Sequence, residues 1–220
     1  MAGGTSTPGD HRALNGQAAG PDAFRAALLA VAPAARDAWL DAQFGLRDLP
    51  EDGSDLPRGC VPYLPSPVDA LLRTVEQTGV CSSDVFVDVG AGLGRAAAFV
   101  QLITGAEVVG IEVQPGLVRA ARELARRLAL PRLSFVEGDA AELPDVLARG
   151  SVFFFYCPFS GERLRKVLGD LEAVARGRPI RIACLDLPLP PCPWLDLELS
   201  TGALTIHRSV GMDRANAARP

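Results

Sequence analysis

The spacing of apolar positions along the chain alternates between a helical period and a strand period. Apolar residues recur at helical spacing over residues 22–44, where Pro33 divides them into two helices. Ser66, followed by a proline, is a helix-start signal, and the apolar face behind it ends at Gly79. Residues 45–65 connect these helices and are rich in proline and glycine. Because a connection of this length is more often functional than idle, we expect it to act as a lid over a binding site.

From residue 84 onward, short apolar runs of strand character alternate with amphipathic helical stretches. Strands are expected at residues 84–89, 107–113, 133–136, 151–156 and 180–185. Helices are expected between them at residues 93–104, 115–128 and 164–174. Five strands that alternate with helices predict a parallel sheet with helices on both faces. Two more runs, joined tightly at Thr201-Gly202, predict an antiparallel hairpin at one edge: residues 195–199 and 204–210.

Composition narrows the class of protein. The 220 residues suffice for one domain, and no stretch approaches eighteen unbroken apolar residues, so we expect no membrane span. A net charge of −4 without a basic run makes nucleic acid a poor candidate partner. The five cysteines form no C-x-x-C pair, which indicates neither a disulfide framework nor a metal site and fits a cytoplasmic location.

Four segments are expected from these patterns. Residues 1–21 have nothing to bury and no secretion signal, so they should form a disordered leader. Residues 22–65 should form a helical N-terminal segment and the lid, followed by a binding domain over 66–210 and a tail over 211–220.

The most informative segment is Val85 to Arg95, which consists of a strand, a glycine turn and a helix start. Glycines 90, 92 and 94 allow a tight reversal and a close approach of ligand to backbone. The helix that follows presents free N–H groups and a positive dipole end. Such a loop alone also fits a dinucleotide, which leaves an NAD-linked oxidoreductase as one alternative.

Three acidic residues at successive strand ends favour a different ligand. A dinucleotide fingerprint requires a glycine where this chain has Arg95, and Asp88 would repel a pyrophosphate. Asp88 instead suits a cationic group, Glu112 can hold both hydroxyls of a ribose, and Asp139 can accept from the amine of adenine. An ammonium, a ribose and an adenine together describe S-adenosylmethionine. Alternatively, Asp88 caps the glycine turn and the other two acids are helix N-caps.

These motifs resemble those of class I S-adenosylmethionine-dependent methyltransferases over roughly residues 60–210. The resemblance rests on Val85–Arg95, Val109-Gly-Ile-Glu112, Val136-Glu-Gly-Asp139 and Phe154-Phe-Tyr-Cys-Pro-Phe159. It implies an α/β, Rossmann-like, seven-stranded and mostly parallel sheet with helices on both faces and a C-terminal antiparallel hairpin. The cofactor-binding residues expected on this basis are Tyr63, Ser66, Asp88, Gly90, Ala91, Gly92, Gly94, Glu112, Val113, Asp139 and Ala140.

Within this class, the chain is most similar to histone-lysine methyltransferases of the disruptor-of-telomeric-silencing type. The similarity lies in Tyr63-Leu-Pro-Ser66 and in the sequence of the glycine strand. The chain differs in having Tyr156-Cys157 where that type has two asparagines, and it lacks basic tails. These differences weigh against a histone as the acceptor.

We expect Tyr156, Cys157 and Phe159, at the end of the fourth strand, to line the pocket of the methyl acceptor. Pro158-Phe159 matches half of the [N/D]-P-P-[F/Y] pattern of amine-directed class I enzymes, which favours a nitrogen on a protein or small metabolite. An oxygen acceptor is the alternative and would need a base such as His207. A non-catalytic S-adenosylmethionine-binding protein is a further alternative.

Overall fold

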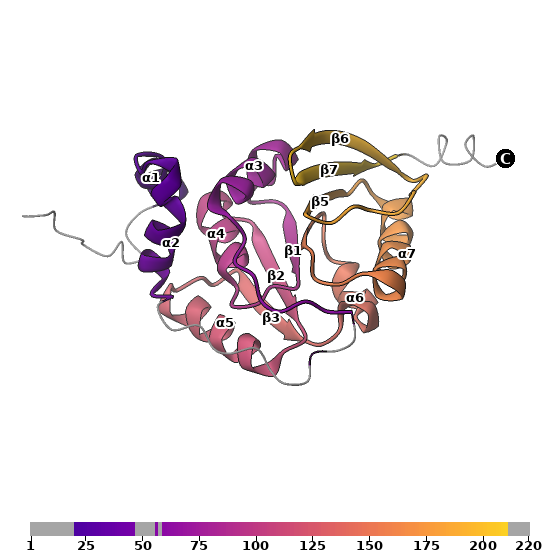
Figure 1. Cartoon of the computed structure of the whole chain (residues 1–220), viewed down its shortest axis with the longest axis horizontal. Helices are drawn as coiled ribbons and strands as arrows, with labels where there is room; N and C mark the ends of the chain where they lie inside the picture. Colours follow the sequence, from indigo (N-terminus) through magenta and orange to yellow (C-terminus); the bar gives the residue numbers. More distant parts are fainter. Residues whose placement is uncertain (1–19, 47–55, 57–58, 211–220) are drawn as a thin grey trace, which may run out of the picture.

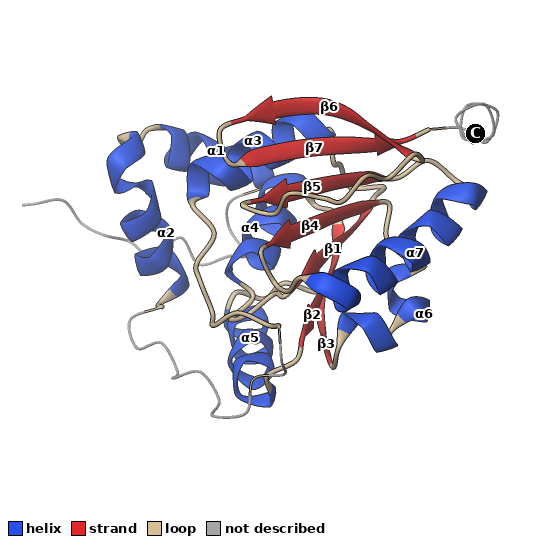
Figure 2. Ribbon diagram, turned by 45° about the vertical axis from the view of Figure 1, so that its right-hand side comes forward, coloured by secondary structure: helices blue, strands red, loops and turns tan. Residues whose placement is uncertain are grey.

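The structure, a computed structural model that describes residues 20–46, 56 and 59–210, is built on a seven-stranded sheet. Its strand order is β3-β2-β1-β4-β5-β7-β6. The first five strands pair in parallel, and β7 runs antiparallel to both β5 and β6 (Figure 2). The strands are β1 (Val85–Val89), β2 (Glu107–Glu112), β3 (Leu133–Glu137), β4 (Val152–Tyr156), β5 (Arg181–Leu185), β6 (Leu195–Thr201) and β7 (Leu204–Ser209). The predicted fold class is confirmed.

Helices cover both faces of this sheet (Figure 1). Helices α1 through α5 pack on one face of the sheet through one buried apolar cluster. Helices α6 and α7 pack on the other face through a second cluster. The α-helices are α1 (Pro21–Leu29), α2 (Arg36–Phe44), α3 (Val68–Thr78), α4 (Arg95–Thr104), α5 (Pro115–Arg127), α6 (Pro144–Leu147) and α7 (Gly161–Gly177). Two short 3-10 helices are η1 (Pro33–Ala35) and η2 (Ala140–Glu142).

The central strand β4 shows why the sequence of a buried parallel strand is continuously apolar rather than alternating. Phe154 packs into one apolar cluster, and its neighbours Phe153 and Phe155 pack into the other. All three side chains are fully buried because helices cover both faces.

Element boundaries differ from the sequence expectations at a few positions. The helix after the glycine turn begins at Arg95, two residues later than expected, because Gly94 adopts a left-handed conformation (φ +75°). The short helices η2 and α6 were not predicted. Among the described residues, no helix has the length and apolarity needed to cross a membrane.

The expected segments are only partly within the described residues. Of the expected leader, residues 1–19 lie outside them, and Pro21 already begins α1. The expected tail, 211–220, lies outside as well, as do residues 47–55 and 57–58 of the expected lid.

The end of α5 gives a test of backbone strain. Ala129 has φ +50°, and the N–H groups of Ala129 and Leu130 donate to the carbonyls of Arg126 and Ala125. A non-glycine residue in this conformation is strained by roughly 1–2 kcal/mol. Ala129→Gly should relieve this strain, and the greater conformational entropy that glycine loses on folding should offset part of the gain. The free energy of unfolding, measured by urea denaturation, should therefore rise by about 0.5–1 kcal/mol.

Gly79 provides the matched control. It has φ +63°, and a Cβ added there would have no heavy atom within 4 Å. Gly79→Ala should therefore lower stability through backbone strain alone. A loss of stability in Ala129→Gly would contradict this account.

Candidate functional site

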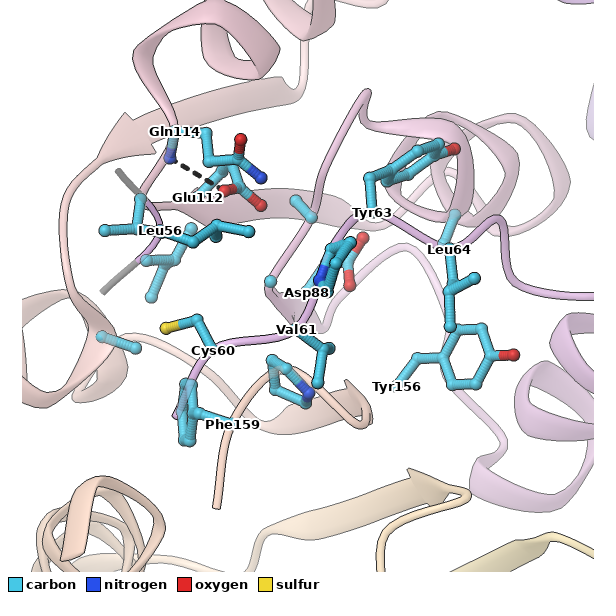
Figure 3. Close-up of a pocket in the computed structure, with 18 of the residues that line it drawn as sticks. Leu56, Cys60, Val61, Tyr63, Leu64, Asp88, Glu112, Gln114, Tyr156 and Phe159 are labelled. Atoms are coloured by element: carbon cyan, nitrogen blue, oxygen red, sulfur yellow. Dashed lines mark hydrogen bonds between the residues drawn. The ribbon is translucent and has the colours of Figure 1, made fainter. Parts of the chain in front are cut away.

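A cavity lies at the carboxyl ends of the parallel strands, where open α/β sheets bind ligands. Its volume is about 770 Å³, counting the part open to solvent. Figure 3 shows Glu112 and Gln114 at one end, Tyr156 and Leu64 at the other, and Asp88 between them. The predicted site residues that line it are Tyr63, Ser66, Asp88, Gly90, Ala91, Glu112, Val113, Asp139, Ala140, Tyr156 and Phe159. Three predicted residues are outside this lining: Gly92, Gly94 and Cys157.

The glycine turn follows β1 and packs tightly against the protein itself. Gly92 has φ +54°, and a Cβ added there would lie 2.2 Å from Cδ2 of Tyr63. At Gly90, with φ +82°, an added Cβ would lie 2.6 Å from Cβ of Pro158. Glycine at these positions therefore permits both the tight reversal and the close approach of two neighbouring segments.

Glu112, at the end of β2, holds this turn in place. Its Oε2 accepts a hydrogen bond from the backbone N–H of Gly92 at 2.9 Å. Its Oε1 accepts from the backbone N–H of Gln114 at 2.8 Å, and the residue is only 6% exposed. Each carboxylate oxygen retains a further lone pair, so the same side chain can still accept from two ribose hydroxyls.

Asp88, at the end of β1, has an unsatisfied oxygen. The side chain is 3% exposed and lines the cavity, and its Oδ2 has no hydrogen-bond partner among the described residues. Burial, and secondarily the charge of Glu112, raise the pKa of Asp88 to about 7. A buried carboxylate of this kind is costly unless a cation or donor joins it, so the site fits the ammonium group of the expected cofactor.

Asp139, after β3, is more fully engaged than Asp88. Its Oδ1 accepts from the backbone N–H of Ala141 and so caps η2, while its Oδ2 pairs with Nε of Arg163 at 2.7 Å. The helix-cap alternative is therefore correct for Asp139. Asp139 still lines the cavity, and a remaining lone pair on its carboxylate can accept a hydrogen bond from an adenine amine.

Residues 59–66, here called the cover segment, cross the cavity. Cys60 forms an isolated antiparallel bridge with Phe159, and the N–H of Val61 donates to the carbonyl of Pro158 at 3.3 Å. Tyr63 lies over the glycine turn and is largely buried, and burial raises its pKa to about 12. The described part of the expected lid thus lies against the cavity.

The three residues expected at the acceptor pocket separate in the structure. Tyr156 lies beside Leu64, whereas Phe159 lies beside Cys60, away from Tyr156 (Figure 3). The thiol of Cys157 donates to the backbone carbonyl of Asp186 at 2.7 Å and does not enter the cavity lining.

His207 lies far from the cavity edge. Strand β7 pairs His207 with Ile182, near the beginning of β5, whereas Leu204 pairs with Leu185 at the end of β5. Three residues, about 10 Å of strand, separate His207 from the edge where ligands bind. Burial lowers the pKa of His207, and its Nε2 lies 3.1 Å from Oγ1 of Thr205. The hypothesis that His207 serves as a base for an oxygen acceptor is therefore wrong.

Sequence reasoning missed two residues that the structure brings to this region. Arg95 lines the cavity, although the sequence indicates it only as a departure from a dinucleotide motif. Its signal is a lone charge at the start of an otherwise apolar helix. Asp186 directly follows β5, and its signal is an acid near the end of a strand, as at Asp139. Among the described residues, no group of three His, Cys, Asp or Glu is arranged to hold a metal ion.

Comparison with known proteins gives one family match in sequence. Residues 86–176 match a family described as a methyltransferase domain. That range begins in β1 and ends in α7, so it includes the glycine turn and all three strand-end acids. No curated protein sequence matches this chain.

Solved structures share the fold at low sequence identity. An RNA methyltransferase from Salinibacter ruber, in complex with S-adenosyl-L-homocysteine, has a TM-score of 0.53 and 23% identity, covering 66% of this chain and 92% of that chain. A putative caffeoyl-CoA O-methyltransferase from Staphylococcus aureus has a TM-score of 0.52 and 10% identity, covering 68% and 85%. TrmN from Thermus thermophilus has a TM-score of 0.51 and 16% identity, covering 64% and 48%.

The raised pKa of Asp88 generates a prediction for ligand binding. A cation binds the ionised carboxylate, so affinity for S-adenosylhomocysteine should be constant above about pH 7 and fall about tenfold per pH unit below it. Asp88→Asn should weaken binding at pH 8 by about 1.5–3 kcal/mol and abolish this pH dependence. Isothermal titration calorimetry at pH 6, 7 and 8 measures both effects.

The same substitution should act in the opposite direction on the stability of the ligand-free protein. The folded-state pKa of Asp88 lies above its ordinary value of 3.8, so its contribution to stability is lost as the pH rises through 7. Asp88→Asn should therefore raise the Tm of the free protein at pH 8 more than at pH 5. Equal affinity for S-adenosylhomocysteine in the variant and the parent would contradict the assignment of Asp88.

Proposed function

We propose that this chain, an S-adenosylmethionine-dependent methyltransferase, transfers its methyl group to a nitrogen atom of a protein or small metabolite. The observation that carries the proposal is the charge of the cavity. Three acids line it, Asp88, Glu112 and Asp139, and Arg95 is the one cation among the described lining residues. Arg95 is already paired with two aspartates, so the described lining offers no free cation to a phosphate and disfavours an anionic acceptor.

The chemistry requires little more than alignment. Bound S-adenosylmethionine supplies a methyl group on a sulfonium, and in-line attack by the acceptor leaves a neutral thioether. Orientation of this kind supplies on the order of 7–11 kcal/mol at best. The backbone carbonyl of Tyr156 can accept a hydrogen bond from the acceptor amine, and its ring can face an ammonium by cation–π contact.

The protonation states of Tyr156 and Cys157 favour a nitrogen acceptor over an oxygen acceptor. Burial, and secondarily Asp186 and Cys157, raise the pKa of the Tyr156 phenol. Burial and Asp186 likewise raise the pKa of the Cys157 thiol. Both groups therefore stay neutral at pH 7 and are poor bases. An amine can lose its proton to solvent before it attacks, whereas a hydroxyl acceptor needs a base that His207 is too distant to supply.

The comparisons support the coarse function and leave the acceptor open to experiment. The similar structures include enzymes named for RNA and for a caffeoyl-CoA oxygen. The narrower resemblance to histone-lysine methyltransferases finds no support among them. We propose that the acceptor is not a nucleic acid, because the described cavity lining is acidic.

An assay with labelled S-adenosylmethionine should show methylation of amine-bearing peptides or metabolites and none of RNA. Turnover should rise with pH toward the pKa of the acceptor amine, because the neutral amine is the nucleophile. Mass spectrometry of the product should place the new methyl group on nitrogen. A methyl group found on oxygen or on RNA would overturn the proposed acceptor class, and a complete absence of turnover would favour a non-catalytic binding protein.

Tyr156 allows a sharper test with a matched pair of variants. Tyr156→Phe retains the ring and the backbone carbonyl, so kcat/KM and its pH profile should change less than about twofold. Tyr156→Ala removes the ring and should lower kcat/KM roughly tenfold, the effect of losing a partly desolvated cation–π contact. A pH-dependent loss of activity in Tyr156→Phe would show that the phenol acts as a base and would favour an oxygen acceptor.

A further inference from the structure

Arg95, the first residue of α4, is a buried cation that joins three separate parts of the chain. Its side chain is only 2% exposed. Nε pairs with Oδ1 of Asp41 at 2.6 Å, and an Nη2 nitrogen pairs with Oδ1 of Asp37 at 2.9 Å. The Nη1 nitrogen donates to the backbone carbonyl of Ser66. One guanidinium therefore connects α2, the end of the cover segment and the helix that follows the glycine turn.

The geometry uses the fork of arginine rather than its charge alone. Two carboxylates and a carbonyl accept from three different nitrogens in one plane, an arrangement that a lysine ammonium does not reproduce. Asp37 reinforces the junction, since its Oδ1 also accepts from the backbone N–H of Val68 at the start of α3.

The cover segment is anchored at two ends. At one end, Cys60 and Val61 pair with the backbone of residues 158–159. At the other end, the carbonyl of Ser66 is held by Arg95. Between these anchors, Tyr63 lies on Gly92, and the segment passes in front of the central strands toward α3 (Figure 1). The position of Tyr63 over the glycine turn therefore depends on both anchors.

We propose that Arg95 is a positioning residue of the cofactor site: it holds the cover segment closed over the cavity, with α2 as the support. In this role Arg95 retains the cofactor by restraining Tyr63, and Asp37 and Asp41 make the N-terminal helices a functional part of the site. The proposal concerns retention of the cofactor and holds whatever the acceptor is.

Alkylation of the cysteines can distinguish local opening of the cover segment from global unfolding. Cys60 lies on the cover segment and is partly buried, so its alkylation reports opening of that segment. Cys184, in β5, is fully buried and reports global unfolding. Cys81 is exposed and serves as an internal standard for the reagent.

Arg36 supplies a matched control. It lies on α2, the helix of Asp37 and Asp41, where it pairs with Asp69 of α3 at 2.7 Å and is mostly buried. This pair docks α2 without contacting the cover segment or the glycine turn. A comparison of Arg95→Lys with Arg36→Lys therefore separates positioning of the cofactor site from general docking of the helix.

The experiment measures two properties, ligand binding and cysteine reactivity, for the parent, Arg95→Lys, Asp41→Asn and Arg36→Lys in the full chain. The first is the Kd of S-adenosylhomocysteine by calorimetry, with its dissociation rate by stopped-flow dilution. The second is the rate of iodoacetamide modification at each cysteine by peptide mass spectrometry. Arg95→Lys should raise both the Kd and the dissociation rate about tenfold, the effect of losing one hydrogen bond to a charged group.

In the ligand-free protein, Arg95→Lys should also raise the Cys60 alkylation rate relative to Cys81, while Cys184 stays unmodified. Asp41 is a partly exposed partner of Arg95, so Asp41→Asn should raise the Kd, the dissociation rate and the Cys60 alkylation rate by less than Arg95→Lys does. Arg36→Lys should leave them within about twofold of the parent. The proposal is overturned if Arg95→Lys binds S-adenosylhomocysteine like the parent, if it matches Arg36→Lys, or if Cys60 and Cys184 become reactive together.

Discussion

The hydrogen bond from the backbone of Gly92 to the carboxylate of Glu112 is the contact on which the site depends. It joins the turn after β1 to the end of β2, and a second bond from Gln114 fixes the other carboxylate oxygen. Parallel strands bring these two ends together only because β1 and β2 pair in register, with Val89 opposite Ile111. The carbonyl of Ile111 then accepts the N–H groups of Gly90 and Ala91, which completes the reversal.

This arrangement gives the three strand-end acids different environments. Glu112 is occupied by backbone donors and stays in place as part of the scaffold. Asp139 caps a short helix and is neutralised by Arg163. Asp88 alone among the three has an oxygen without a partner in the described structure, and it lies between the two ends of the cavity. The same residue type thus provides a scaffold, a paired wall and an unsatisfied binding group, according to its neighbours.

The sequence predicts best what depends on local periodicity. The strands, the glycine turn and the edge hairpin follow from apolar runs and turn residues, and each is present near its expected position. Contacts between distant segments leave no such pattern. Arg95 is one residue in a helical run, and nothing local indicates that Asp37 and Asp41, more than fifty positions earlier, lie against it. His207 fails as a base for a similar reason, because register along β7 rather than residue type decides its depth in the sheet.

The edge hairpin supports the residues that follow β4 and β5, in addition to completing the sheet. Cys157 and Asp186 follow adjacent strands, and both adopt left-handed backbone conformations (φ +46° and +51°) that cost free energy in non-glycine residues. Two contacts hold them: the Cys157 thiol donates to the Asp186 carbonyl, and the Asp186 N–H donates to the carbonyl of Ala203 in the β6–β7 turn. Because β7 is antiparallel to β5, that turn returns to the carboxyl edge of the sheet. The turn between the two antiparallel edge strands therefore supports strained residues that follow β4 and β5.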